Sequence, residues 1–217
     1  MLWLYLPIHL SECTNQRMKI DLGCSIYTQS GYLGIDILRV PGVGLLADAR
    51  KMPFADSSIE EVYSSHCIEH IDDQLAVISE LCRICEPSAL IYIIVPHFSN
   101  PSYYDDLTHC HHYSTRSFEH YDQRVQEANG HPNYLPEVNL KLESVRMNYW
   151  PERTIIRKSF LKGLILRVLN RVLSAMANTN HFVCERFWCR WVGGFFEVEY
   201  KFKVIKEVKS GGSHSNT

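Results

Sequence analysis

Short apolar runs alternate with small and polar residues along the first half of the chain. Five of these runs are expected to be β-strands, at 18–22, 32–37, 43–47, 61–65 and 89–95. The run 89–95 is apolar without alternation, which is typical of a central parallel strand covered on both faces. The pattern predicts a parallel sheet with this run near its centre.

Helical periodicity follows and precedes the central strand. One helix is expected over 72–85, because acidic residues stand at its start and Pro87 lies just beyond its end. A second helix is expected over 115–128. Two more strands are predicted, at 140–149 and 197–204, and the latter alternates apolar and polar residues.

The first two connections between strands are too short to hold a helix. A crossover helix ordinarily needs about a dozen residues, and the segments 23–31 and 36–44 are shorter. Extended chain must therefore cross these gaps, which leaves apolar surface on one flank of the sheet. The amino-terminal segment, a helix near the carboxyl end or a second subunit could bury it, so a homodimer is compatible with the sequence.

The longest periodic segment spans 151–177, and the helix inserted between the last two strands is assigned to 152–177. Its apolar residues recur every fourth position, and its polar side is almost entirely basic. Such a helix can lie on an anionic membrane as a peripheral contact. The simpler interpretation, which we prefer, is that the apolar stripe packs on the poorly covered flank of the sheet. Trp188 and Trp191 beyond it are either packing residues or one wall of an acceptor pocket.

Length and composition set the outer limits. The 217 residues with 46% apolar content fit one domain, assigned to 1–210, with residues 211–217 as a disordered tail. Within it we distinguish a ligand-binding core at 18–95, a loop and helix at 96–135, and the last strands at 136–206. The net charge of −2 argues against nucleic acid as a partner. Eight scattered cysteines in apolar contexts and no leader segment favour a cytoplasmic protein.

Carboxylates stand at the ends of three expected strands: Asp21 before Gly23, then Asp36, then Asp48. Ligands of open α/β sheets bind at the carboxyl ends of the strands, where glycine admits a ligand close to the backbone. A carboxylate there can accept both hydroxyl protons of a ribose, as Asp36 would, and Asp48 could accept from an adenine amino group. Aspartate also forms turns, but three in register favour a ligand site.

The order and spacing of these motifs resemble the class I S-adenosylmethionine-dependent methyltransferases over about residues 19–116. The most specific part is Ser-Ser-His-Cys-Ile-Glu-His-Ile at 64–71, followed by Leu-Cys-Arg-Ile-Cys-Glu-Pro at 81–87. The resemblance implies an α/β fold: a Rossmann-like, mainly parallel sheet with helices on both faces. It also implies that the first two crossover helices are short or missing and that the last strand is antiparallel.

The resemblance further implies a site for S-adenosylmethionine, with S-adenosylhomocysteine as product. Gly23 and its neighbours would face the methionine part, Asp36 the ribose, and Asp48 with Ala49 the adenine. Ser65 and His66 would line the cofactor from the end of the fourth strand. The full predicted cofactor site is Asp21, Gly23, Cys24, Ser25, Asp36, Ile37, Asp48, Ala49, Arg50, Ser65 and His66.

One departure from the family pattern keeps a second hypothesis open. The family's glycine-rich loop is replaced here by Cys24 and Ser25, whose Cβ atoms restrict positive φ and hold a ligand away from the main chain. A non-catalytic relative that retains the fold as a binding module is therefore the alternative. A nicotinamide dehydrogenase is disfavoured because Gly-x-Gly-x-x-Gly and its helix are absent from the sequence.

A segment rich in histidine and tyrosine follows the fifth strand, at 96–114. It leaves the carboxyl end of a central strand, so it would overhang the cofactor and position the acceptor. His97 and His109 are the candidate bases, with Asp106 as a third candidate catalytic residue. The resembling family often has the patterns Pro-His-Phe and Asp-x-Thr-His here, which match 96–98 and 106–109.

The same segment contains enough histidine, cysteine and aspartate to suggest a metal. Its spacing matches no standard metal signature, so we predict no metal and rank a metal-dependent hydrolase low. Any single histidine could equally be a hydrogen-bonded packing residue. The leading hypothesis is methyl transfer to an oxygen or nitrogen of a small molecule, saccharide or lipid-linked acceptor.

Overall fold

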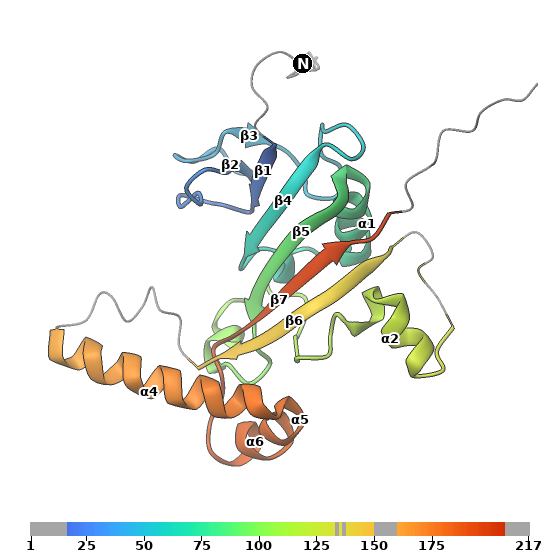
Figure 1. The fold of residues 1–217 in the computed structure, drawn as a ribbon. Coiled ribbons are helices and arrows are strands. Elements are labelled where there is room, and N and C mark those ends of the chain that lie inside the picture. The colour runs from blue at the N-terminus through green and yellow to red at the C-terminus, as the bar shows by residue number, and fades with distance from the viewer. Residues whose placement is uncertain (1–16, 133–134, 136–137, 150–159, 207–217) are drawn as a thin grey trace, which may run out of the picture.

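A computed structural model describes residues 17–132, 135, 138–149 and 160–206. They form one seven-stranded sheet of order β3-β2-β1-β4-β5-β7-β6, in which β7 runs antiparallel to both neighbours (Figure 1). The strands are β1 Met18–Leu22, β2 Leu33–Asp36, β3 Leu45–Leu46, β4 Ile59–Ser65, β5 Cys85–Pro96, β6 Leu140–Asn148 and β7 Glu197–Val204. All seven expected strands are present, and the predicted Rossmann-like fold class is confirmed.

The first two crossovers contain no helix, as predicted, and extended loops join β1 to β2 and β2 to β3. The first α-helix in the described chain is α1 (Gln74–Ile84), which joins β4 to β5 after the 3₁₀ turn η1 (Ile68–His70). Asp73 caps α1 by accepting a hydrogen bond from the Ala76 N–H at 3.0 Å. The predicted helix at 72–85 and the observed α1 therefore agree to within two residues at each end.

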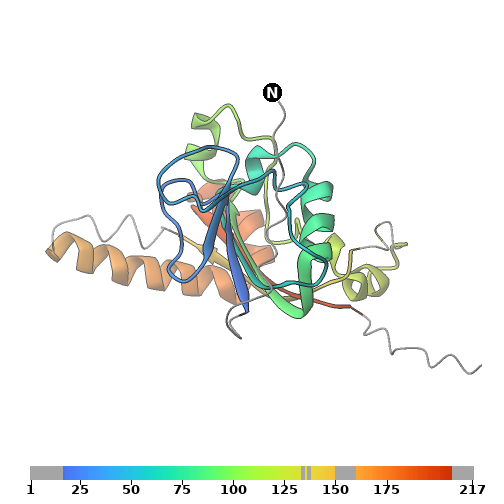
Figure 2. The ribbon, with the colours of Figure 1, turned by 90° about the horizontal axis from the view of Figure 1, so that it is seen from above.

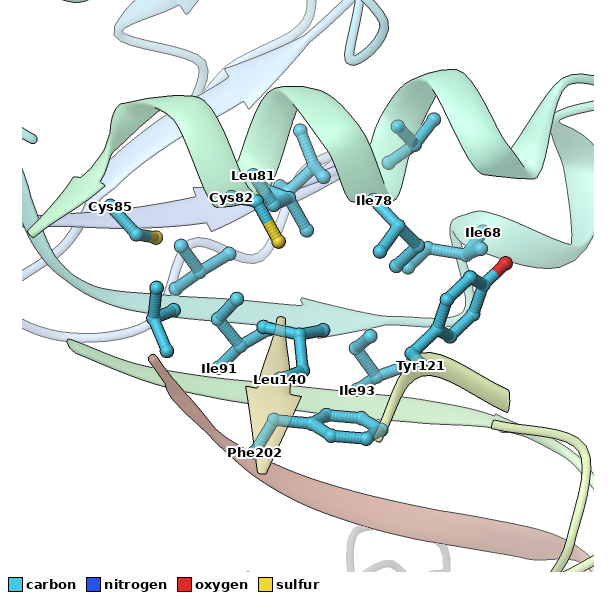
Figure 3. Close-up of a cluster of buried hydrophobic side chains, with 14 of the residues drawn as sticks. Ile68, Ile78, Leu81, Cys82, Cys85, Ile91, Ile93, Tyr121, Leu140 and Phe202 are labelled. Carbon is cyan, nitrogen blue, oxygen red and sulfur yellow. The ribbon is translucent and has the colours of Figure 1, made fainter. Parts of the chain in front are cut away.

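The core lies between α1 and one face of the sheet (Figure 3). Ile78 and Leu81 of α1 pack over Ile91 and Ile93 of β5, and all four side chains are fully buried. On the opposite face of β5, alternate residues such as Tyr92 are only partly buried. Burial of large aliphatic side chains, each contributing roughly 1.5–3 kcal/mol, thus concentrates on the α1 face.

The predicted helix over 115–128 is wrong in its first half. Two short pieces replace it, the 3₁₀ turn η3 (Glu119–Tyr121) and α2 (Gln123–Ala128). The break falls at Asp122, whose buried carboxylate accepts from the N–H of Arg124 at 3.1 Å and of Leu142 at 2.9 Å. Asp122 therefore caps α2 and fastens it to β6, and this end of α2 cannot continue upstream as a regular helix.

The long amphipathic helix is α4 (Phe160–Thr179), and residues 151–159 of the predicted segment lie outside the described residues. It is followed by α5 (His181–Val183), the π-helical turn η4 (Cys184–Trp188) and α6 (Cys189–Trp191). Another 3₁₀ turn, η2 (Pro101–Asp105), follows β5. Figure 1 shows α4, α5 and α6 gathered beyond the lower ends of β6 and β7.

The preferred packing of the apolar stripe of α4 on the bare flank is wrong. Asn178 of α4 accepts from the Met147 N–H and donates to the Met147 carbonyl, each at 2.9 Å, which fixes the helix to the end of β6. β6 is the edge strand farthest from β3, so the carboxyl end of α4 is held at the opposite edge of the sheet from that flank. The described α-helices include none long and apolar enough to cross a bilayer.

The tail at 211–217 lies outside the described residues, as does the amino-terminal segment. The assignment of residues 1–210 to one domain stays a prediction.

Candidate functional site

A cleft of about 460 Å³ opens at the carboxyl ends of β1 to β4, the place predicted for a ligand. The predicted residues that line it are Gly23, Ser25, Asp36, Ile37, Asp48, Ala49, Arg50 and His66. Leu22, Ile35, Leu38, Ala47, Cys67, His70, Ile71 and Asp72 complete the lining and were not predicted. The walls therefore combine a few polar groups with aliphatic side chains, which is typical of small-molecule sites.

Asp21, Cys24 and Ser65 belong to the predicted site but do not line the cleft. Asp21 is buried, and its Oδ2 accepts from the Gln29 N–H at 2.6 Å, so it holds the loop between β1 and β2. Burial raises the pKa of the Asp21 carboxyl, and the bond from Gln29 partly offsets this. Cys24 is also buried. Asp21 and Cys24 therefore support the loop between β1 and β2 from the buried side.

Asp36 stands at the end of β2 with its carboxylate in the cleft. Its Oδ2 accepts from the Ser25 N–H and its Oδ1 from the Leu38 N–H, both at 2.9 Å. Each carboxylate oxygen has a second lone pair, so both can accept a further hydrogen bond. The two backbone bonds fix the carboxylate in one orientation, with acceptor capacity left for a pair of hydroxyl groups.

Ser25 reaches this geometry in the left-handed region, with φ at +48°. A residue with a Cβ pays a conformational penalty of about 1–2 kcal/mol there. The bond from its N–H to Asp36 offsets part of that cost. The loop thus adopts a turn that glycine would favour, without the glycine.

Asp48 faces Arg50 across the cleft wall. The guanidinium donates through Nε to Oδ1 at 3.0 Å and through Nη2 to Oδ2 at 2.8 Å. These hydrogen bonds lower the pKa of the Asp48 carboxyl, and they occupy both of its oxygens. An adenine amino group at Asp48 would have to share these oxygens with Arg50, whereas neighbouring Ala49 offers an apolar contact.

His66 lies at the end of β4 between two carboxylates. Its Nδ1 is 3.3 Å from Glu69 Oε1, and its Nε2 is 3.2 Å from Glu197 Oε2. Burial lowers the pKa of His66, but hydrogen bonds with Glu197 and Glu69 outweigh it and raise the pKa to about 9. The ring is thus an imidazolium at neutral pH, and Phe196 packs edge-on against it.

The structure does not support His97 as a base facing the cleft. The side chain is fully buried, with Nδ1 2.6 Å from Ser99 Oγ and Nε2 3.2 Å from Glu185 Oε1. Glu185 also accepts from the Thr115 N–H at 2.6 Å. His97 therefore ties the segment after β5 to η4, and both its ring nitrogens are engaged.

His109 lies beside the cleft. Its Nδ1 is 2.8 Å from the Tyr103 carbonyl oxygen, which can only accept, so Nδ1 donates this hydrogen bond and Nε2 takes no part in it. The ring centre lies 4.7 Å from that of His70, which lines the cleft. Asp106 Oδ1 accepts from the Thr108 hydroxyl at 2.6 Å, and that hydroxyl is 2.8 Å from His70 Nδ1. Asp106 therefore positions His70 through Thr108.

The turn after β4 contributes groups that sequence reasoning missed. Glu69, His70 and His109 offer ligand atoms that all lie within 4.8 Å of one another, so this trio is where a cation could bind. Glu69 is fully buried and has His66 as its ion-pair partner. The spacing of His66, Glu69 and His70 is the i, i+3, i+4 pattern of one helical face, which was available in the sequence. The prediction of no metal stays a prediction.

A second cavity, of about 360 Å³, lies between α4 and the α5–α6 segment. It is lined mainly by apolar and aromatic side chains, including Met176, Phe187, Trp188, Trp191 and Phe195. Phe195 faces this cavity, while the next residue, Phe196, contacts His66 of the first cleft. Consecutive residues thus contact the two cavities. Trp188 and Trp191, the two tryptophans considered in the sequence analysis, both line the second cavity.

Part of this chain is similar in sequence to known methyltransferases. Residues 33–93 match the sequence profile of a family described as a methyltransferase domain. The O-methyltransferase rstn1 of Aspergillus nomiae is 26% identical over 89 residues, which cover 40% of this chain. The match spans 36% of that relative's length.

Two solved structures share the fold. An S-adenosylmethionine-dependent methyltransferase from Archaeoglobus fulgidus superposes with a TM-score of 0.50 and 18% identity, over 87% of this chain and 86% of that one. The YcgJ protein of Bacillus subtilis also has a TM-score of 0.50, with 13% identity over 91% of this chain and 95% of its own. At these identities the likeness concerns the fold.

Proposed function

We propose that this chain is a class I S-adenosylmethionine-dependent methyltransferase, which transfers the methyl group of S-adenosylmethionine to an acceptor; the methyltransferase-domain match over residues 33–93 and the shared fold support this. The acceptor atom is an oxygen or nitrogen of a small molecule, saccharide or lipid-linked compound. S-adenosylhomocysteine is the second product.

The observation that carries this proposal is the placement of Asp36 in the cleft. Its carboxylate is oriented by two backbone N–H groups and keeps acceptor capacity for the two hydroxyls of a ribose. Ile37, Leu38 and Ile71 supply apolar surface beside it for a flat purine ring. The donor and acceptor groups of the cleft therefore fit the cofactor.

Methyl transfer from this cofactor requires little from the protein beyond holding the two reactants in position. When bound, S-adenosylmethionine supplies a methyl carbon on a sulfonium that is already a good leaving group. The chain must align the acceptor and take up its proton where it has one. His109 suits the second task, since the Tyr103 carbonyl holds its ring through Nδ1 and Nε2 is the nitrogen that would take up the proton. His66, an imidazolium between two carboxylates, does not suit it.

The test is formation of S-adenosylhomocysteine when the protein and S-adenosylmethionine are mixed with separate pools of hydroxylated or amine-bearing small molecules, saccharides and lipid-linked sugars. We expect one pool to raise the rate above that of the acceptor-free mixture. His109→Gln should lower kcat more than it raises the KM for the acceptor, because it removes a proton acceptor and keeps the side chain polar.

The non-catalytic binding module remains the alternative, and Ser25 in place of a glycine is the observation that favours it. The two hypotheses differ in outcome. A folded protein that does not bind S-adenosylmethionine is the module, whereas one that binds it and forms S-adenosylhomocysteine with a pool is the methyltransferase.

A further inference from the structure

A dense group of exposed apolar side chains lies on α4, α5 and α6. Trp191 is 84% exposed, Phe187 60% and Val168 55%, and Val172, Met176 and Val192 are also at least half exposed. We call this group the α4–α6 surface. Figures 1 and 2 show the beginning of α4 projecting away from the sheet, with no other described element alongside it. Apolar patches of this kind mark interaction sites.

The charges of the same segment are almost all positive. Residues 163–192 contain four arginines, Arg167, Arg171, Arg186 and Arg190, and all four are exposed. Their one acid is Glu185, whose carboxylate turns inward to His97 and the Thr115 N–H. An apolar surface bordered by arginines and tryptophan complements an anionic lipid interface.

A second copy of the chain suits this surface less well. A two-fold dimer sets a patch against itself, so the arginines of both copies would meet across the contact without carboxylates to pair with. Like charges brought together in this way cost several kcal/mol. Charge therefore favours an anionic partner over self-association.

The apolar cavity of about 360 Å³ opens on this surface, because Met176, Phe187 and Trp191 both line it and are exposed. Its inner wall, Phe195, precedes Phe196, which contacts His66 in the cofactor cleft. The cavity and the cofactor cleft are therefore connected through two consecutive residues of the chain.

We propose that the α4–α6 surface docks on an anionic lipid surface and that the adjoining cavity holds the apolar chain of a lipid acceptor. This inference rests on the proposed methyl transfer and narrows its acceptor to the lipid-linked class. Docking and chain binding share some side chains, but Val168 and Val172 lie on the surface outside the cavity and Ala177 is a buried part of the cavity wall, so each can be removed separately.

Docking is tested by flotation of the full chain with phosphatidylcholine vesicles, with and without one quarter phosphatidylglycerol. We expect binding to the anionic vesicles at least tenfold above the neutral ones, weakened by 0.5 M salt. The double variant Val168→Ser with Val172→Ser should bind at least tenfold less, since it removes two inserted apolar side chains. The control is Leu75→Ser, a partly exposed leucine on α1, which should bind as the wild type does.

Chain binding is tested by calorimetric titration with monomeric dodecyl phosphate. One saturable site per chain is expected, and Ala177→Leu, which adds three carbons at the cavity wall, should weaken it at least tenfold while vesicle binding persists. The Val168 and Val172 double variant should show the reverse pattern.

Besides a lack of vesicle binding, three results would overturn the inference. They are equal binding to neutral and anionic vesicles, equal losses in the Leu75→Ser control, or a dimer by light scattering that the double variant converts to a monomer. S-adenosylmethionine binding is measured on the same samples. If it is intact while vesicle binding is absent, the lipid inference fails alone; if it is absent in the wild type, the methyl-transfer proposal fails.

Discussion

Gly23 marks the point where β1 turns into the cleft, and the absence of a side chain lets Cys67 pack beside it. Its φ is +70°, and a Cβ built there would lie 2.3 Å from Cys67 Sγ. Gly31, in the same loop, has a φ of +84° and no heavy atom within 4 Å of such a Cβ. The two glycines share a conformation but differ in their surroundings.

This pair separates backbone strain from steric conflict. Gly31→Ala should lower the free energy of unfolding by about 1–2 kcal/mol through its left-handed φ. Gly23→Ala should cost about 1–3 kcal/mol more, because Cys67 must move. Urea unfolding of both variants measures the difference, and equal losses would show that the contact with Cys67 is unimportant.

His66 makes stability depend on pH in the alkaline range. Hydrogen bonds with Glu197 and Glu69 raise its pKa to about 9 in the folded chain, above the 6.5 of an unperturbed histidine. The folded state therefore holds the proton more tightly, and the stabilisation is complete below pH 6.5. It declines as the pH rises and is lost above about 9, a change on the order of 3 kcal/mol.

The measurement is the free energy of unfolding between pH 6 and 10 for the wild type and His66→Gln. The wild type should lose stability across this range, and the variant should lose that part of the slope. A wild-type curve as flat as that of the variant would mean that His66 is neutral at pH 7.

At the scale of elements, no helix holds the connection between β3 and β4 in place, and Arg83 of α1 does so instead. Its guanidinium donates to the Met52 carbonyl at 3.1 Å and the Phe54 carbonyl at 2.9 Å, and it pairs with Glu80 at 2.8 Å. Glu80 in turn accepts from the Met52 N–H at 2.6 Å. One ion pair thus fastens an irregular connection to the helix.

Arg83→Lys keeps the charge but cannot form this set of bonds. We expect it to lower the unfolding free energy by about 2 kcal/mol, because partly buried acceptors lose their donors. The matched control is Arg116→Lys, since Arg116 forms an exposed pair with Glu119 and should change stability by less than about 0.5 kcal/mol. Equal losses of unfolding free energy in the two variants would show that Arg83 does not stabilise the connection between β3 and β4.

Strands were predictable from the sequence because each needs only a local apolar run, as β7 (Glu197–Val204) illustrates. Partners distant in sequence were not. The helix break at Asp122 depends on the Leu142 N–H, twenty residues on. The burial of His97 depends on Glu185, which is 88 residues away. Periodicity indicated that α4 has an apolar face but not what that face contacts.

At the scale of the whole molecule, the cleft depends on the missing crossover helices, because the loops that replace them form part of its wall. Extended loops after β1 and β2 bring Ser25, Asp36 and Leu38 together, so two backbone N–H groups orient the Asp36 carboxylate in the cleft. The place of Asp36 in the site was predictable, because the order of strands puts the carboxyl end of β2 at the cleft. The arginine that occupies Asp48 was not, because its side chain folds back only in three dimensions.

The central claim is that this cleft binds S-adenosylmethionine through Asp36, and calorimetric titration with S-adenosylmethionine and S-adenosylhomocysteine tests it most directly. We expect one site per chain for the wild type and at least a tenfold weaker affinity for Asp36→Asn, because one hydroxyl loses a charged acceptor. Glu127→Gln, the same loss of charge at an exposed position on α2, should bind as the wild type does. A folded wild-type protein that binds neither compound, or an Asp36→Asn variant that binds both with unchanged affinity, would contradict the account.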